Sequence, residues 1–204
     1  ERAVFQRLAP VAKNLDLPKD WRVKFQPADD IGDRPSLDTL GPFRWSPSPA
    51  TQWELTDGQG KQHTLADYTG RPVIVIFYLG KGCAHCIEQL GTFAPETDRF
   101  RQAGIDLIAI STDDVDGLRE TVQQDKTGTP FPFPLVSDAS LKVFKQYRAY
   151  DDFEQQPLHG TFLIDRQGLV RWQDISYEPF TEAEFLLRES KRLLAQDPPQ
   201  VTQR

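Results

Sequence analysis

The chain has 204 residues, of which 38% are hydrophobic, and a formal net charge of −6 at pH 7. This composition suits one packed domain with room for an extension and excludes a disordered or collagen-like chain. The negative charge repels the phosphates of nucleic acids and anionic lipids, so neither is expected as a partner. The longest apolar run, VIVIFYL at 73–79, is far shorter than a bilayer span, so no membrane insertion is expected in this segment.

Residues 1–50 differ from the rest because they hold seven of the sixteen prolines. We predict a proline-rich N-terminal extension with a short amphipathic helix from Arg2 to Leu15, tied to the main domain by Trp21 and Trp45. The alternative is the end of an upstream domain. The chain begins ERAVFQRLAP and contains no methionine, which we interpret as a processed or excised piece.

A regular pattern of strands and helices follows in a predicted main domain at 51–196, before a flexible tail at 197–204. Proline removes a backbone donor, so Pro95 is expected to kink a helix that starts at Cys83, with Ile87 and Leu90 on its inner face. Strands that alternate with helices and end in a hairpin predict an α/β fold, a mixed central sheet flanked by helices. The expected elements are a hairpin at 51–65, a strand at 71–79, the helix from 83, a strand at 104–111, a helix at 114–124, a strand at 133–138, a helix at 139–147, a hairpin at 160–176 and a helix at 181–195 with a capping box of Thr181 and Glu184.

Both cysteines of the chain, Cys83 and Cys86, lie between the apolar strand and the helix, in FYLGKGCAHCIEQL. The first turn of a helix presents unpaired N–H groups and the positive end of the helix dipole. These stabilise a thiolate and lower the thiol pKa from about 8.5. The second sulfur lies one turn away and can close a disulfide, so the motif predicts a dithiol that cycles between two oxidation states. Two cysteines leave the cellular compartment undecided.

Other roles for the pair fit less well. A zinc site needs four ligands, and His63, His85 and His159 are available, but there is no second Cys-x-x-Cys and no paired-histidine spacing. Covalent haem attachment requires a histidine where Ile87 stands. A purely structural disulfide would close a very short loop and add little stability. We therefore expect no metal and no cofactor.

Four blocks occur in an order and spacing that resemble the thioredoxin-like superfamily, on its peroxiredoxin-like (AhpC/TSA, redoxin) branch. The resemblance covers about Trp53 to Leu194 and implies a thioredoxin fold and thiol-based redox activity. The blocks are LADYTGRPVIVIFYLGKGCAHC, GIDLIAISTDD, PFPLVSDASLKVFKQY and GTFLIDRQGLVRW.

The chain departs from this family at several positions. Leu79 stands where peroxiredoxins carry a proline, Cys83 where they carry a threonine, and Cys86 at the peroxidatic position. His159 falls near the family's active-site arginine. Pro157 lies two residues before the place of the cis-proline of thioredoxins.

Two catalytic mechanisms and one non-catalytic role remain open. As a peroxidase, Cys86 attacks a hydroperoxide and Cys83 resolves the sulfenic acid, with an external dithiol as reductant. As a thioredoxin- or TlpA-like protein disulfide reductase, Cys83 attacks a substrate disulfide and Cys86 resolves it. The third possibility is a non-catalytic thioredoxin-like interaction module that uses the N-terminal arm.

Two histidines are candidate supporting residues. His159 is expected to bond the active sulfur or a bound oxygen, or else to be satisfied by backbone carbonyls. His85, inside the motif, either stabilises the thiolate by positive charge or is an incidental surface residue. Lys81 is expected to be an ordinary exposed lysine.

Overall fold

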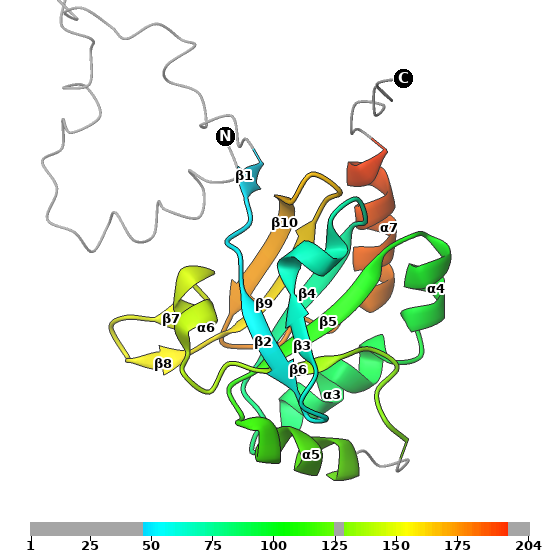
Figure 1. The fold of residues 1–204 in the computed structure, drawn as a ribbon. Helices are drawn as coiled ribbons and strands as arrows, with labels where there is room; N and C mark the ends of the chain where they lie inside the picture. The colour runs from blue at the N-terminus through cyan, green and yellow to red at the C-terminus, as the bar shows by residue number, and fades with distance from the viewer. Residues whose placement is uncertain (1–46, 125–128, 196–204) are drawn as a thin grey trace, which may run out of the picture. The chain divides into compact units, whose positions relative to one another are not determined.

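A computed structural model describes residues 47–124 and 129–195 of the chain (Figure 1). The predicted helix at Arg2–Leu15, both anchoring tryptophans and the tail lie outside these ranges, so the predicted domain boundaries stay predictions. None of the helices in the described ranges has the length and apolar character needed to cross a membrane.

The described residues form an eight-stranded sheet, a separate two-stranded ribbon of β7 and β8, and helices around the large sheet. The strands are β1 Ser48–Pro49, β2 Glu54–Asp57, β3 Gln62–Thr64, β4 Val73–Tyr78, β5 Asp106–Ser111, β6 Leu135–Ser137, β7 Tyr150–Asp151, β8 Gln156–Pro157, β9 His159–Ile164 and β10 Leu169–Ser176. The helices are the 3₁₀ helix η1 Leu65–Tyr68 and the α-helices α3 Ala84–Phe93, α4 Thr97–Gln102, α5 Val115–Gln124, α6 Lys142–Gln146 and α7 Ala183–Leu194.

The large sheet is mixed, in the order β1-β10-β9-β4-β5-β6-β2-β3. Strand β4 lies at its centre, parallel to β5 and antiparallel to β9. The parallel pairs β4–β5 and β5–β6 come from strand–helix–strand connections. The antiparallel pairs come from the closing hairpin β9–β10, which also pairs with β4 and β1, and from the hairpin β2–β3, which pairs with β6. The predicted α/β fold, a thioredoxin fold with a mixed central sheet flanked by helices, is confirmed.

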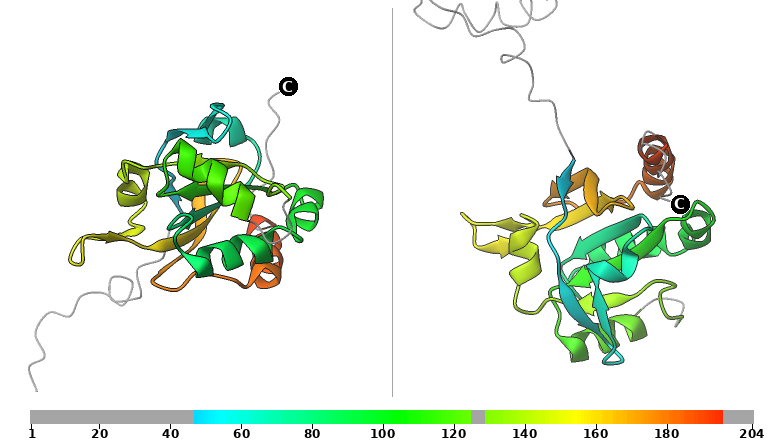
Figure 2. Two further views of the ribbon diagram at one scale, coloured as in Figure 1. Left: turned by 90° about the horizontal axis from the view of Figure 1, so that it is seen from below. Right: turned by 45° about the horizontal axis from the view of Figure 1, so that its top comes forward.

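Both faces of β4 are covered, as the continuous apolar run predicted, and all six of its residues are buried. Because strand side chains alternate, Ile74, Ile76 and Tyr78 pack with α3, α4 and α7 on one face. Val73, Val75 and Phe77 pack with α6 and η1 on the other. The two layers of helices are visible on opposite sides of the sheet in Figure 2.

Pro95 divides the helix that follows the cysteines instead of only kinking it, since α3 ends at Phe93 and α4 begins at Thr97. Leu90 is buried as predicted. Ile87 is only half-buried, and Gln89 occupies the inner face.

The predicted capping box of α7 is wrong. The helix begins at Ala183, and its N-cap is Glu182, which makes no side-chain cap bond. Thr181 precedes the cap, and its carbonyl accepts the N–H of Ala183 at 2.9 Å. Glu184 is directed to Arg99, 3.7 Å away. The helix is held by burial of its apolar face, which includes Ala183, Leu186 and Leu187, and not by a side-chain cap.

Candidate redox site

The sheet topology brings the cysteines and His159 together although Cys86 and His159 are 73 positions apart in the sequence. Strand β4 leads through the loop 79–82 into α3, and Cys83 is the N-cap of that helix. Strand β9 runs antiparallel to β4, with Phe77 opposite Gly160. The first residue of β9 therefore lies at the end of the sheet where β4 delivers the cysteine motif.

The loop before the motif rests on the carboxylate of Asp113. The N–H of Lys81 donates to its Oδ2 at 2.8 Å. Gly80 has φ +88°, and a Cβ there would lie 2.5 Å from the Asp113 Oδ1. The hydroxyl of Thr112 donates to the carbonyl of Leu79 at 2.9 Å. No local sequence pattern indicates this role of Asp113, because the contact joins positions 32 residues apart.

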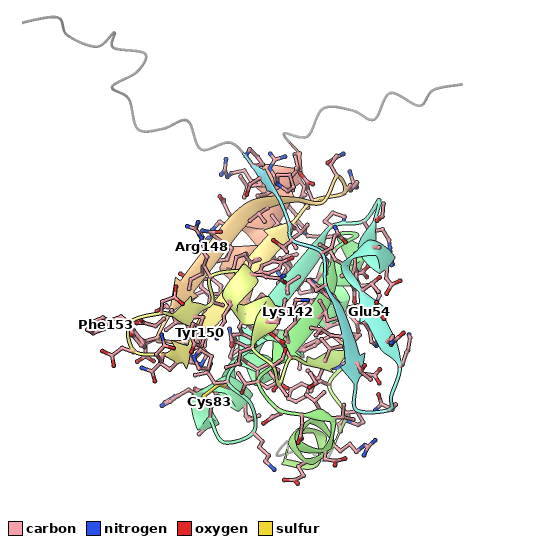
Figure 3. All side chains as sticks on the ribbon, turned by 60° about the vertical axis from the view of Figure 1, so that its left-hand side comes forward. Glu54, Cys83, Lys142, Arg148, Tyr150 and Phe153 are labelled. Atoms are coloured by element: carbon pink, nitrogen blue, oxygen red, sulfur yellow. A yellow bond between two sulfur atoms is a disulfide. The ribbon has the colours of Figure 1, made fainter. Side chains whose placement is uncertain are left out.

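The two sulfurs form a disulfide and differ in exposure. Cys83 and Cys86 are bonded, with their Cα atoms 5.2 Å apart. Cys86 is fully buried, whereas Cys83 is partly exposed and lies at the periphery of the domain, on the side to which the ribbon bearing Phe153 projects (Figure 3). Solvent and a partner thiol therefore reach Cys83 first.

Backbone N–H groups point at both sulfurs. The N–H of Cys86 donates to Cys83 Sγ at 3.2 Å, and the N–H of Leu79 donates to Cys86 Sγ at 3.3 Å. Such donors favour a thiolate over a thiol, as does the start of a helix. After reduction, the sulfur of either Cys83 or Cys86 can therefore carry the negative charge of a thiolate.

His159 is 4% exposed and lies beside both sulfurs. Its Nε2 lies 3.1 Å from Cys86 Sγ and 3.8 Å from Cys83 Sγ. Its Nδ1 lies 2.8 Å from the carbonyl oxygen of Tyr177. A carbonyl only accepts, so Nδ1 carries the hydrogen of the neutral ring and the lone pair of Nε2 faces the sulfurs.

Burial lowers the pKa of His159 below its ordinary value of 6.5. The bond to the Tyr177 carbonyl and the charge of Glu178 act in the opposite direction, and burial outweighs them. At pH 7 the ring is therefore neutral and able to accept a proton at Nε2.

The other sequence candidates lie elsewhere. The side chain of His85 is 75% exposed, and its Nδ1 is 3.7 Å from a carboxylate oxygen of Glu88. Lys81 pairs with Glu120. His63 is bonded to a buried carboxylate in the β2–β3 hairpin. Within the described ranges, Cys83, Cys86 and His159 form the only group of three or more His, Cys, Asp or Glu side chains placed to hold a metal ion, with their ligand atoms within 4.8 Å of one another.

A thioredoxin-type sheet with Cys-x-x-Cys at the start of the helix after its central strand defines a member of the thioredoxin-like superfamily. A family model described as the AhpC/TSA family matches residues 47–173, which is more than half of the chain. The chain belongs to the AhpC/TSA family.

Similar proteins agree with this assignment. The chain is 32% identical over 126 residues to a chloroplastic peroxiredoxin Q of Oryza sativa subsp. japonica, covering 61% of this chain and 56% of the relative. It is 34% identical over 118 residues to a chloroplastic peroxiredoxin Q of Suaeda salsa, covering 57% and 53%. The chain thus spans little more than half the length of these relatives.

Solved structures show the same fold. The peroxidoxin BcpB of Mycobacterium tuberculosis superposes with a TM-score of 0.63 at 22% identity, covering 74% of this chain and 97% of that one. AhpC of Enterococcus faecalis gives a TM-score of 0.65 at 16% identity, covering 72% and 90%.

The tight fit of Gly80 against Asp113 predicts a difference between two neighbouring glycines. Gly80→Ala should lower the free energy of unfolding by about 1–3 kcal/mol, because the residue has positive φ and the new methyl meets the carboxylate. Gly82→Ala is the matched control, since a Cβ there meets nothing within 4 Å and its cost should stay within about 0.5 kcal/mol. Urea unfolding measures both, and equal losses would contradict the role of Asp113.

The lowered pKa of His159 predicts that the disulfide form loses stability as the pH falls below 6.5. The unfolded chain takes up this proton at the ordinary pKa, whereas the folded chain takes it up only at lower pH, so protonation favours unfolding throughout that window. Below the lowered pKa the loss is complete. His159→Gln should remove this part of the pH dependence and His85→Gln should keep it. Urea unfolding at a series of pH values tests this, and an unchanged slope in His159→Gln would sink the prediction.

Proposed function

We propose that this chain is a thiol-dependent peroxide reductase in which Cys86 attacks the peroxide and Cys83 resolves the product. The observation that carries the proposal is the Nε2 of His159, whose lone pair faces Cys86 Sγ at 3.1 Å. Reduction of the disulfide would give Cys86 a thiol at this distance from the neutral imidazole, which is the arrangement that general-base activation requires.

The reaction balances with these three side chains and one external reductant. In the reduced protein, Nε2 takes the proton of the Cys86 thiol. The thiolate attacks one oxygen of the hydroperoxide, the O–O bond breaks, and the imidazolium returns a proton to the departing alkoxide. Cys86 is now a sulfenic acid, and the Cys83 thiol attacks it to form the disulfide and water.

Regeneration starts at the exposed sulfur. A thiolate of an external dithiol forms a mixed disulfide with Cys83, and Cys86 leaves as a thiolate. The N–H of Leu79 and the neighbouring His159 stabilise that leaving group. The second thiol of the reductant then releases Cys83. The reducing partner is thus a dithiol able to reach the edge of the domain.

Membership of the AhpC/TSA family supports this function, since the relatives above are named peroxiredoxins. Cys86 stands at the family's peroxidatic position. The family's proline and threonine are replaced by Leu79 and Cys83, and His159 stands near the arginine position. We propose that His159 acts on the peroxide in place of that arginine.

One observation favours a protein disulfide reductase as the second candidate. Cys83 is both the N-cap of α3 and the accessible sulfur, which suits attack on a substrate disulfide with Cys86 as the resolving thiol. None of the peptide bonds in the described residues is cis, including the bond before Pro157.

The non-catalytic alternative depends on the N-terminal arm, which lies outside the described residues.

Single cysteine variants separate the two reactions. With hydrogen peroxide and a small-molecule thiol as reductant, Cys83→Ser should retain peroxide consumption, because Cys86 still forms a sulfenic acid that the small thiol reduces. Cys86→Ser should consume no peroxide above background. Peroxide-dependent thiol loss measures both. The reverse pattern would overturn the assignment, and rapid insulin reduction by the wild type with no peroxide turnover would establish the disulfide reductase instead.

The imidazole contact predicts a contrast between two histidines. His159→Ala should slow the reaction of the reduced protein with peroxide by about 10²-fold or more, since it removes the general base. His85→Ala is the matched control, because its exposed ring lies outside the cluster, and it should react at nearly the wild-type rate. Stopped-flow measurement of disulfide formation gives both rates. Equal rates in the two variants would remove His159 from the mechanism.

A further inference from the structure

The redox cluster also has the composition of a metal site. Two sulfur atoms and one imidazole nitrogen, all within 4.8 Å of one another, come from α3 with its N-cap and from β9. Thiolate and imidazole are the donors that soft and borderline d¹⁰ cations prefer. The sequence-based expectation of no metal rested on the lack of a fourth ligand for zinc, which a three-coordinate ion does not need.

The nitrogen donor is already oriented. The Tyr177 carbonyl accepts the Nδ1 hydrogen of His159 at 2.8 Å, so the Nε2 lone pair points at both sulfurs without a change of tautomer. A histidine ligand whose second nitrogen donates to a backbone carbonyl is the usual arrangement at protein metal centres. A further bond, from the Tyr177 hydroxyl to Asp151, attaches the same residue to the β7–β8 ribbon.

The surroundings favour a complex that carries negative charge. Two thiolates with one monovalent cation leave a net charge of minus one. The N–H of Leu79 reaches Cys86 Sγ, the N–H of Cys86 reaches Cys83 Sγ, and the N-terminus of the ten-residue helix α3 adds its positive dipole end. Divalent zinc would neutralise the pair but would be one ligand short among the described side chains.

We infer that the reduced protein binds one Cu(I) ion through Cys83 Sγ, Cys86 Sγ and His159 Nε2. Copper stays monovalent throughout, the two thiols lose their protons to solvent, and the imidazole binds in its neutral form. The disulfide form lacks both thiolates and does not bind the ion. A dithiol that reduces the pair therefore also creates the copper site. Bound Cu(I) keeps the two sulfurs from forming the disulfide.

The test is an anaerobic titration of the fully reduced chain with Cu(I) in competition with the chelator bicinchoninate. The expected result is one Cu(I) per reduced chain and none per oxidised chain. His159→Ala should weaken the affinity by more than about tenfold, and His85→Ala, the matched control, should leave it unchanged. X-ray absorption of the wild-type complex should show two sulfur neighbours and one nitrogen neighbour, which needs no variant to fold.

Each other outcome overturns a part of the inference. Loss of all copper to the chelator removes the site. Equal affinity in wild type and in a His159→Ala protein of native circular dichroism removes the histidine from the ligand set. Stoichiometric Zn(II) binding that Cu(I) does not displace makes zinc the ion instead.

Copper binding and the proposed peroxide chemistry are tested separately. The metal-free reduced chain is assayed for peroxide turnover, and the copper titration is read without peroxide. Failure of either leaves the other standing, although both use the same three side chains.

Discussion

The antiparallel pairing of β9 with β4 is the constraint on which the site depends. Alternation along β9 directs Phe162 to the layer of α6 and Leu163 to the layer of α3, where Cys86 lies. His159 has the same parity as Leu163, so it faces α3 as well. A slip of one residue would turn the imidazole to the opposite face, away from both sulfurs.

Contacts along the same strand hold this register in place. Thr161, two residues after His159, accepts a hydrogen bond from Gln89 of α3 at 3.4 Å. Gly160 admits no side chain easily, since a Cβ there would lie 2.9 Å from the ring of Phe162. The packing that stabilises the sheet and the placement of the imidazole are therefore parts of one arrangement.

Much of the fold could be predicted because its signals are local. The continuous apolar run of β4 and the strand–helix alternation determine the sheet, and the spacing of Cys83 and Cys86 indicates a dithiol at a helix start. The β7–β8 ribbon was missed because its strands have two residues each and no hydrophobic periodicity. The support from Asp113 and Tyr177 was missed because both act across the fold, one of them through a main-chain carbonyl.

The two sulfurs of the pair differ in burial, so they are not equally accessible. Cys86 is enclosed among apolar side chains and touched by an imidazole, whereas Cys83 is open to larger molecules. A large reactant such as a protein thiol can therefore contact Cys83 directly but not Cys86.

The contact that orients His159 comes from the backbone of Tyr177, whereas the ring of that residue is largely exposed and its hydroxyl bonds to Asp151. No replacement of the side chain at this position removes a carbonyl oxygen. A substitution at position 177 can therefore change the exposed surface beside the site, whereas the carbonyl that fixes the hydrogen of His159 on Nδ1 is preserved.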